Sequence, residues 1–365
     1  MNPPVKNKTT KPTGIKEIAA ALNISIGTVD RALHDRPGVS PKTRARVMKM
    51  AEKLNYRPNV AARSLKLNRR MRIGVNLPRQ IASFFDPLRE GIRAAAAATH
   101  GLNLELDFQM YPRLGDGDLE MLEGTLERHY DGLILTPGDP VRMDPLVRRL
   151  TQQGTAVVCV ASDAPRTDRL AAVCVDAAAS GGIAAELFGR VIREKGPVAT
   201  ITGSLGTLDH AEKLRGFAAT LATVAPHLSL LPVMESHERP KEAYQATLAL
   251  LGQRPRPLGI YISTANSLPV LRALEEQRML GQIEIITTDL FPDLVPLIES
   301  GKIMATLYQR PFTQGKVAME MLAHYLTDGV RPETVNRLAP HIVLRSNLPL
   351  FLNRISANGS EADDR

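Results

Sequence analysis

Apolar positions in the first seventy residues recur every three or four places in three short segments, as in helices that bury one face. Asn23-Ile24-Ser25 separates the segments 15–22 and 26–33, and Ser25 is placed to cap the second helix. Ser40-Pro41 is a strong start signal for a third helix. This pattern predicts a small domain whose first two helices form a helix-turn-helix. The expected inward positions are Ile15, Ile18, Ala19, Leu22, Val29, Ala32, Leu33, Val47, Met50, Ala51 and Leu54.

From Arg72 onward, short apolar runs alternate with amphipathic helical segments. This alternation predicts parallel sheets covered by helices. One compact sheet would not hold so many strands, so we expect two α/β lobes with a ligand cleft at the carboxyl ends of the strands. The expected strands are 73–77, 104–108, 132–136, 156–160, 198–202, 228–234, 259–262, 283–288 and 303–308.

Positive charge is concentrated at the N-terminus. The whole chain of 365 residues carries a net charge of +8, but residues 1–72 hold 17 Lys/Arg against 4 Asp/Glu, which leaves the remaining 293 residues at −5. A surface for a polyanion is therefore expected in the first domain. Its exposed cations suit a phosphate backbone, and they are Arg31, Arg36, Lys42, Arg44, Arg46, Lys49 and Lys53.

Several classes of protein are disfavoured by the sequence. No apolar stretch approaches the ~20 residues that span a bilayer, and the N-terminus lacks the apolar segment of a secretory signal, so we expect a cytoplasmic protein without a membrane partner. Cys159 and Cys174 lie in apolar runs and are expected to pack in the core. Catalytic, phosphate-binding and dinucleotide motifs are missing. We therefore expect no enzyme, no catalytic residue, no metal and no cofactor, and Gly203-Ser204-Leu205-Gly206 is expected to be a strand-to-helix turn.

One composite motif carries a specific resemblance. It comprises Ile18-Ala19, Ser25, Thr28-Val29, Arg31, Val39-Ser40, Thr43-Arg44, Val47 and, above all, Leu54-Asn55-Tyr56-Arg57-Pro58-Asn59 followed by Ala62-Arg63-Ser64-Leu65. The first part of the chain thus resembles, without a gap over about fifty residues, the headpiece of LacI/GalR transcriptional regulators. The resemblance implies a disordered basic tail at 1–12, a DNA-binding headpiece at 13–57 and a hinge helix with its linker at 58–71.

The same resemblance implies how the headpiece would bind DNA. The second helix would enter the major groove, with Arg31 as the strongest candidate for reading a guanine. A homodimer would bind a palindromic double-stranded DNA operator, and Leu65 would wedge into the minor groove. Asp30 stands where the family commonly has serine, and it would either orient Arg31 or accept from a cytosine. The implied DNA contacts are Ser25, Ile26, Gly27, Thr28, Arg31, Asn59, Ala62, Leu65 and Lys66.

Residues 72–352 resemble the type I periplasmic-binding fold of ribose-receptor proteins. The expected fold class is therefore an all-α three-helix helix-turn-helix headpiece followed by an α/β, two-lobed, Rossmann-like effector domain. The chain would cross between the lobes near Asp176, Tyr308 and Ala339, and the segment 353–365 would be a disordered tail. The landmarks include Tyr130-Asp131-Gly132, Arg215-Gly216-Phe217, Thr288-Asp289 and Gln309-Arg310-Pro311.

The resemblance also implies an effector site. Phe84 and Phe85, in the loop after the first strand, match the aromatic position that packs on a sugar ring. Asp289 matches an acid that accepts from ligand hydroxyls, and Gln309 matches an amide at a lobe crossing. Lys213 occupies a position usually held by arginine. The candidate residues are Phe84, Phe85, Ser162, Asp163, His210, Lys213, Thr264, Asn266, Asp289 and Gln309.

These expectations combine into a regulator, with repressor as the favoured sense. A small effector would control its binding to DNA; a neutral sugar, polyol or cyclitol is favoured, and Lys213 leaves room for a sugar acid or phosphate. The alternative is a solute receptor without a role in transcription. Whether the ligand releases or promotes DNA binding is open at this stage.

Overall fold

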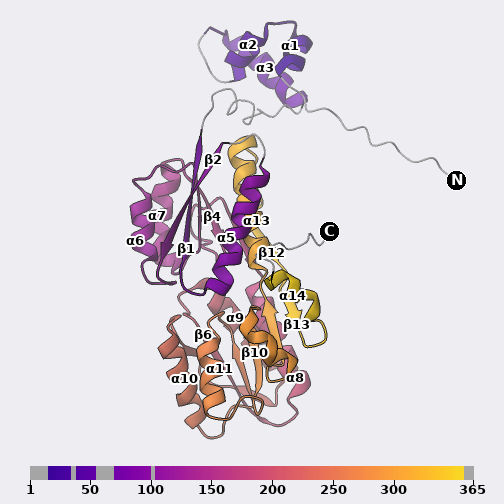
Figure 1. The fold of residues 1–365 in the computed structure, drawn as a ribbon. Coiled ribbons are helices and arrows are strands. Elements are labelled where there is room, and N and C mark those ends of the chain that lie inside the picture. The colour runs from indigo at the N-terminus through magenta and orange to yellow at the C-terminus, as the bar shows by residue number, and fades with distance from the viewer. Residues whose placement is uncertain (1–14, 34–37, 55–69, 100–102, 357–365) are drawn as a thin grey trace, which may run out of the picture. The chain divides into compact units, whose positions relative to one another are not determined.

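The computed structural model describes residues 15–33, 38–54, 70–99 and 103–356. They belong to two compact units, a headpiece within residues 1–69 and a body that begins at Arg70 (Figure 1). The hinge helix and the tail at 1–12 lie outside the described residues, as do the expected DNA contacts Asn59, Ala62, Leu65 and Lys66.

The headpiece has the three predicted helices, α1 (Ile15–Leu22), α2 (Ile26–Leu33) and α3 (Pro41–Lys53). All eleven positions expected to face inward lie in its core or pack against it, together with Ile24 and Val39. So small a core is possible because each helix contributes one apolar face and leaves its other face to solvent. The prediction of a three-helix headpiece is confirmed.

Serine hydroxyls cap two of these helices. Thr28 N–H donates to Ser25 Oγ at 3.1 Å, and Thr43 N–H donates to Ser40 Oγ at 3.2 Å. Each bond satisfies one of the backbone N–H groups that a helix leaves unpaired in its first turn. The caps therefore lie where the sequence predicted them.

Removing the cap of α3 gives a first prediction. Ser40→Ala should lower the free energy of unfolding of the headpiece by about 1 kcal/mol, because the N–H of Thr43 loses its acceptor. Ser40→Gly should cost only a few tenths. Hydrogen exchange of the α3 amides in the full-length protein measures both changes. Equal protection in the alanine variant and the parent would contradict the prediction.

The first lobe of the body is a six-stranded parallel sheet in the order β12-β5-β4-β3-β1-β2. Helices α5 and α13 cover one face, and α6 and α7 cover the other. The strands are β1 (Met71–Pro78), β2 (Leu104–Tyr111), β3 (Gly132–Leu135), β4 (Ala156–Val160), β5 (Ala171–Val175) and β12 (Val335–Leu338). The helices are α5 (Ala82–Ala98), α6 (Asp118–Thr125), α7 (Pro140–Gln152) and α13 (Pro311–Asp328).

The second lobe repeats this plan with the path β13-β11-β10-β9-β6-β7, and β8 pairs with β6. Its strands run parallel except β13 against β11. They are β6 (Gly196–Thr202), β7 (Leu228–Leu230), β8 (Met234–Glu235), β9 (Gly259–Ile262), β10 (Glu284–Thr288), β11 (Ala305–Tyr308) and β13 (His341–Val343). The helices are α8 (Ala177–Val191), α9 (Leu208–Val224), α10 (Pro240–Gly252), α11 (Leu268–Glu276), the 3₁₀ turn η1 (Pro292–Leu294), α12 (Val295–Glu299) and α14 (Pro349–Ser356).

The continuous apolar runs of the central strands follow from this layering. In β4, Val157 and Cys159 point to the core under α6 and α7, while Val158 and Val160 point to the core under α5 and α13. Successive side chains of a strand alternate between faces, and both faces are covered by helices. Cys159 is fully buried as expected, Cys174 is partly buried, and both thiols are free.

The chain passes between the lobes at the three predicted places. It leaves the first sheet after β5 at Asp176, returns after β11 at Gln309-Arg310, and crosses again between β12 and β13 at Ala339-Pro340. Since three chain segments thus connect the lobes, any movement of one lobe relative to the other must bend the backbone at these segments.

Three details differ from the sequence prediction. The run 228–234 forms two short strands rather than one; Pro232, between them, has no N–H for a ladder bond. Three strands were missed: β12 and β13 are short and β12 is only half-buried, whereas β5 is a mostly buried apolar run that was not counted among the expected strands. The expected tail from Asn353 begins later, since α14 continues to Ser356. None of the helices within the described ranges has the length and apolar character of a membrane span.

Candidate functional site

Helix α2 presents the expected base-reading residues on its exposed side. Val29 and Ala32 are buried in the headpiece core, whereas Ile26 is 49% exposed and Gly27 and Arg31 are exposed. A β-carbon placed on Gly27 would lie 4.0 Å from a terminal nitrogen of Arg31. The guanidinium therefore reaches back toward the start of the helix, as long helical side chains do.

In the body, a cavity lies between the lobes where strands of both sheets end. Residues after β1, β3 and β4 face residues that follow β6, β8, β9 and β11. This is where parallel sheets place ligands, because loops from several strands converge at one edge. The lining residues are Ile81, Phe84, Phe85, Leu114, Thr136, Ala161, Ser162, Thr207, Asp209, His210, Lys213, Glu238, Thr264, Ala265 and Gln309.

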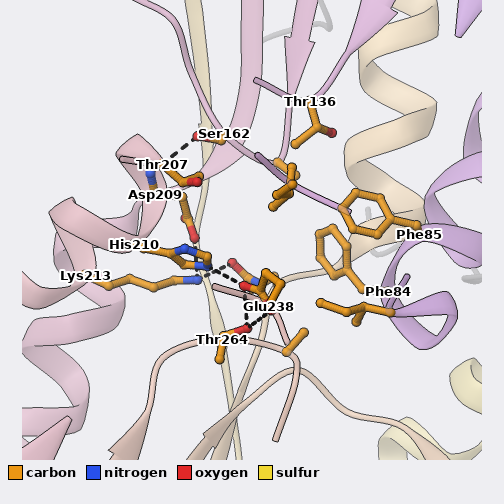
Figure 2. A pocket seen from close by; sticks show the side chains of 15 residues that line it. Phe84, Phe85, Thr136, Ser162, Thr207, Asp209, His210, Lys213, Glu238 and Thr264 are labelled. Carbon is orange, nitrogen blue, oxygen red and sulfur yellow. Dashed lines mark hydrogen bonds and ion pairs between the residues drawn. The ribbon is translucent and has the colours of Figure 1, made fainter. Parts of the chain in front are cut away.

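Two phenylalanines form the apolar wall. Figure 2 shows Phe84 and Phe85 on one side of the cavity, opposite the side chains from α9. Their ring centroids are 4.9 Å apart with an interplanar angle of 85°, an edge-to-face packing that suits aromatic quadrupoles. They lie in the first turn of α5 and not in a loop as the sequence suggested. A helix holds such rings more rigidly than a loop would.

Helix α9 supplies the opposite, polar wall. Lys213 is 1% exposed, and its ammonium donates to Asp209 Oδ2 at 2.7 Å and to Gln309 Oε1 at 2.9 Å. Asp209 and Lys213 are one helical turn apart, so their ion pair also stabilises α9. A buried ammonium needs this pairing because an uncompensated charge in the interior is costly.

Gln309 connects this pair to Asp289. The backbone N–H of Gln309 donates to Asp289 Oδ1 at 2.9 Å, and its amide Nε2 donates to Asp289 Oδ2 at 2.7 Å. Asp289 does not line the cavity. Its expected contact with a ligand is thus replaced by a contact with the lobe crossing, and burial raises the pKa of this carboxyl to about 6.

The raised pKa of Asp289 gives a second prediction. In the unfolded chain its pKa is near the ordinary value of 3.8, so the folded state takes up the proton first as the pH falls. The resulting stabilisation is complete below about pH 4 and is lost as the pH rises through 6. The protein should therefore gain stability relative to Asp289→Asn on acidification from pH 7.5 to 4.5, by about 2 kcal/mol. Denaturant unfolding measures this, and a constant difference across the range would contradict it.

Glu238 is the centre of a second buried cluster. Thr264 Oγ1 lies 2.8 and 2.9 Å from its two carboxylate oxygens, and His210 Nε2 lies 3.4 Å from Oε1. A β-carbon at Gly203 would come within 1.9 Å of Glu238 Oε1 and 2.3 Å of His210 Cε1. Gly203 begins the turn between β6 and α9, as expected, and its lack of a side chain is what lets this acid approach the histidine.

Left-handed backbone conformations gather at the cavity. Among its lining residues, Ile81, Ala161 and Glu238 have φ angles of 59°, 67° and 54°, and Asp289 and Arg310 beside it have 67° and 57°. Such conformations are unfavourable for residues other than glycine. They persist where surrounding structure enforces them, which is common at binding sites.

Seven of the ten candidate effector residues line the cavity, and three do not. Asp163 instead forms a buried ion pair with Arg169 Nη2 at 2.7 Å. Asn266 lies behind Thr264, to which its backbone N–H donates at 3.1 Å, and Asp289 holds Gln309. Protein partners thus hold the side chains of Asp163 and Asp289, and Asn266 lies outside the cavity lining.

Sequence reasoning missed several lining residues, of which Asp209 and Glu238 matter most. Asp209 had a usable signal, since it precedes Lys213 by four positions in a helical segment. Glu238 follows a predicted strand by four residues, at the edge where ligands bind. The others are Ile81, Leu114, Thr136, Ala161, Thr207 and Ala265.

Two polar atoms of the lining residues are buried without a partner. They are Asp209 Oδ1 and Thr136 Oγ1, which belong to opposite lobes. Buried polar groups are nearly always hydrogen-bonded, so each such atom needs a physical explanation. A ligand in the cavity can supply the missing bonds.

Comparison with known proteins agrees with both parts of the structure. Residues 14–59 match the model of "Bacterial regulatory proteins, lacI family", and residues 73–329 match the "Periplasmic binding protein domain". The second match alone spans more than half of the chain.

The chain also resembles individual proteins along nearly its whole length. It is 24% identical to catabolite control protein A of Priestia megaterium over 91% of this chain and 98% of that one. It is 25% identical to the HTH-type transcriptional repressor PurR of Aliivibrio fischeri (strain MJ11) over 93% and 99%. Among solved structures, a solute-binding protein of Agrobacterium vitis bound with α-D-tagatopyranose superimposes with a TM-score of 0.71 at 18% identity, over 80% of this chain and all of that one. The chain therefore belongs to the LacI family of DNA-binding transcriptional regulators, in which a helix-turn-helix headpiece precedes a periplasmic binding protein domain.

Proposed function

We propose that this regulator senses a small, hydroxyl-rich molecule of the sugar or polyol class in the cavity between its lobes. The observation that carries the proposal is the pair of unpartnered polar atoms, Asp209 Oδ1 and Thr136 Oγ1, in a cavity walled by two phenylalanines. Sugar rings have apolar faces that pack on aromatic side chains and hydroxyls around their rim that hydrogen-bond.

The geometry of the cleft suggests how such a ligand would be sensed. The cavity measures about 40 Å³, room for only a few water molecules, so a monosaccharide would enter only if the lobes part. Three bonds between the lobes would have to open: Thr207 Oγ1 to Gly138 O at 2.7 Å, Asp209 N to Ser162 Oγ at 3.4 Å, and Gln80 Nε2 to Glu238 O. Ligand binding would thereby change the angle at the three crossings.

The proposed output is a change in DNA affinity. Two protomers would pair through their bodies, and lobe movement would bring the two hinge segments together or apart on a palindromic operator. The free energy that couples the two sites would be on the order of 1–3 kcal/mol, as is typical of allosteric proteins. The similarity to transcriptional repressors along nearly the whole chain supports repression as the favoured sense of regulation.

The test is operator selection from random DNA, followed by footprinting with a panel of sugars, polyols and cyclitols. We expect a palindromic site, bound with strong salt dependence, and at least one compound that changes DNA affinity by 5- to 150-fold. Absence of any preferred palindrome would refute dimeric operator binding. If a palindrome were found but no compound altered DNA affinity or thermal stability, the sensor part would fail.

A further inference from the structure

We infer that the cleft selects an uncharged ligand that donates hydrogen bonds, a neutral sugar or polyol, and that it rejects sugar acids and sugar phosphates. This rests on the proposed function, since it concerns the ligand of the same cavity. It also decides a point that the residue types left open, because Lys213 left room for a sugar acid or phosphate.

The first reason is that Lys213 is already occupied. Its ammonium has three N–H donors, and it lies 2.7 Å from Asp209 Oδ2 and 2.9 Å from Gln309 Oε1. The carboxylate of Asp209 neutralises its charge at contact distance. The amide of Gln309 is held in turn by its Nε2, which donates to Asp289 Oδ2 at 2.7 Å, so the side chain cannot turn away without breaking this bond. An anionic ligand would have to displace Asp209 from its own ion pair.

The second reason is the balance of charge around the cavity. Asp209 and Glu238 line it against a single lysine, and His210 adds a positive charge only when protonated. Of the described residues that line the cavity, none is an arginine, the side chain whose planar fork binds carboxylates and phosphates bidentately. A carboxylate placed here would thus meet the buried Glu238 and the partly buried Asp209 without a free cation, which is unfavourable at low dielectric.

The third reason is the chemistry of the unpartnered atoms. Asp209 Oδ1 is a carboxylate oxygen, so it can only accept hydrogen bonds while ionised, whereas Thr136 Oγ1 can donate or accept. A ligand satisfies Asp209 only if it brings a donor. Sugar and polyol hydroxyls are such donors. An ionised carboxylate or phosphate oxygen only accepts hydrogen bonds, so it cannot bond to Asp209 Oδ1.

Matched pairs of compounds test the inference on the full-length protein at pH 7.5. The probes are D-galactose against D-galacturonate, and D-glucose against D-glucuronate and glucose 6-phosphate, with myo-inositol as a neutral cyclitol. Binding is measured by titration calorimetry and by thermal shift. The expected result is that neutral members bind and that each acid or phosphate binds at least about 10-fold more weakly than its neutral partner.

Asp209→Asn makes the test reciprocal. Asparagine keeps the size of the side chain but leaves Lys213 without its counter-charge, so the variant should lose affinity for neutral ligands by about 10-fold or more and gain affinity for the uronates. Asp293→Asn, at an exposed position outside the cavity lining, is the matched control and should bind as the parent does.

The outcomes separate the two proposals. If a uronate or the phosphate bound the parent protein more tightly than its neutral partner, the ligand class would be wrong while the sensing function stood. If no compound of the panel bound, the sensing function itself would fall and the inference with it. Should Asp209→Asn not fold, the comparison of neutral and anionic compounds on the parent decides alone.

Discussion

Replacing Arg31 by alanine should lower affinity for the cognate operator by about 10- to 100-fold per half-site, while binding to random DNA changes little. A bidentate contact between arginine and guanine contributes about 1–3 kcal/mol of discrimination. Arg31 is positioned for such a contact, since it is exposed beside Ile26 and Gly27 on the face of α2 opposite Val29 and Ala32. The affected quantity is the ratio of specific to non-specific affinity.

Arg46→Ala is the control for this prediction. Arg46 is an exposed arginine of the same headpiece, on α3, so its loss should weaken binding to all sequences alike or leave it unchanged. Fluorescence anisotropy with operator and scrambled duplexes at several salt concentrations separates the two effects. If Arg31→Ala weakened both duplexes equally, Arg31 would be a phosphate contact and not a reader of bases.

Gly181→Ala should destabilise the body by about 3 kcal/mol or more, with a fall in melting temperature of about 6–12 °C. A β-carbon at Gly181 of α8 would lie 1.9 Å from the carbonyl oxygen of Lys213 and 2.7 Å from the nitrogen of Phe217, both backbone atoms of α9. Backbone atoms cannot rotate away as side chains can, so the two helices must separate. Because the displaced atom belongs to Lys213, the polar wall of the cavity should shift as well.

Gly182→Ala is the control one position along the same helix. There the nearest atom is the hydroxyl oxygen of Thr220 at 3.0 Å, with the next at 3.9 Å. A small movement of that side chain suffices, and alanine favours the helix over glycine by about 1 kcal/mol, so stability should change by less than 1 kcal/mol in either direction. Similar losses in the two variants would contradict the close-crossing explanation.

The first lobe has the same device. A β-carbon at Gly91 of α5 would lie 2.0 Å from Phe312 O of α13, and one at Gly315 of α13 would lie 2.0 Å from Leu88 O of α5. In the second lobe, Gly181 and Gly216 are reciprocal in the same way, since Gly216 faces Ala178 O at 2.0 Å. Helix pairs of both lobes thus cross at glycine contacts, and Figure 1 shows α5 and α13 running alongside each other. The role of these glycines cannot be recognised from the sequence, because it depends on which helices cross in the folded protein.

The headpiece was almost completely predictable because its determinants are local. Helix caps act within three residues, as Ser25 and Ser40 do, and an apolar face can be recognised within a single helix. Most strands of the body were predictable for a related reason, since burial on both faces leaves continuous apolar runs, although β5 was not counted among them. Strands β12 and β13 lack that signal and were found only through their partners β5 and β11.

The cleft was predictable in place but not in detail. Residue type correctly placed Phe84, Lys213 and Gln309 at the cavity. It could not show that Asp163 would form an ion pair with Arg169 or that Asp289 would accept hydrogen bonds from Gln309, because these contacts depend on which partner lies nearest in three dimensions.

The sequence by itself determined that this chain joins a basic helix-turn-helix headpiece to a two-lobed α/β body, while the three lobe crossings followed from its resemblance to the periplasmic-binding fold. Caps, charge and periodicity are properties of neighbouring residues, so they are readable along one dimension. Only the tertiary structure decided the electrostatics of the cleft. The sequence alone does not show that Lys213 has partners. Folding brings Gln309, 96 positions away, into contact with its ammonium, and it leaves one carboxylate oxygen of Asp209 without a hydrogen bond. Coulomb interactions in a desolvated interior are strong and depend on the distance between the charges, and those distances come from the fold.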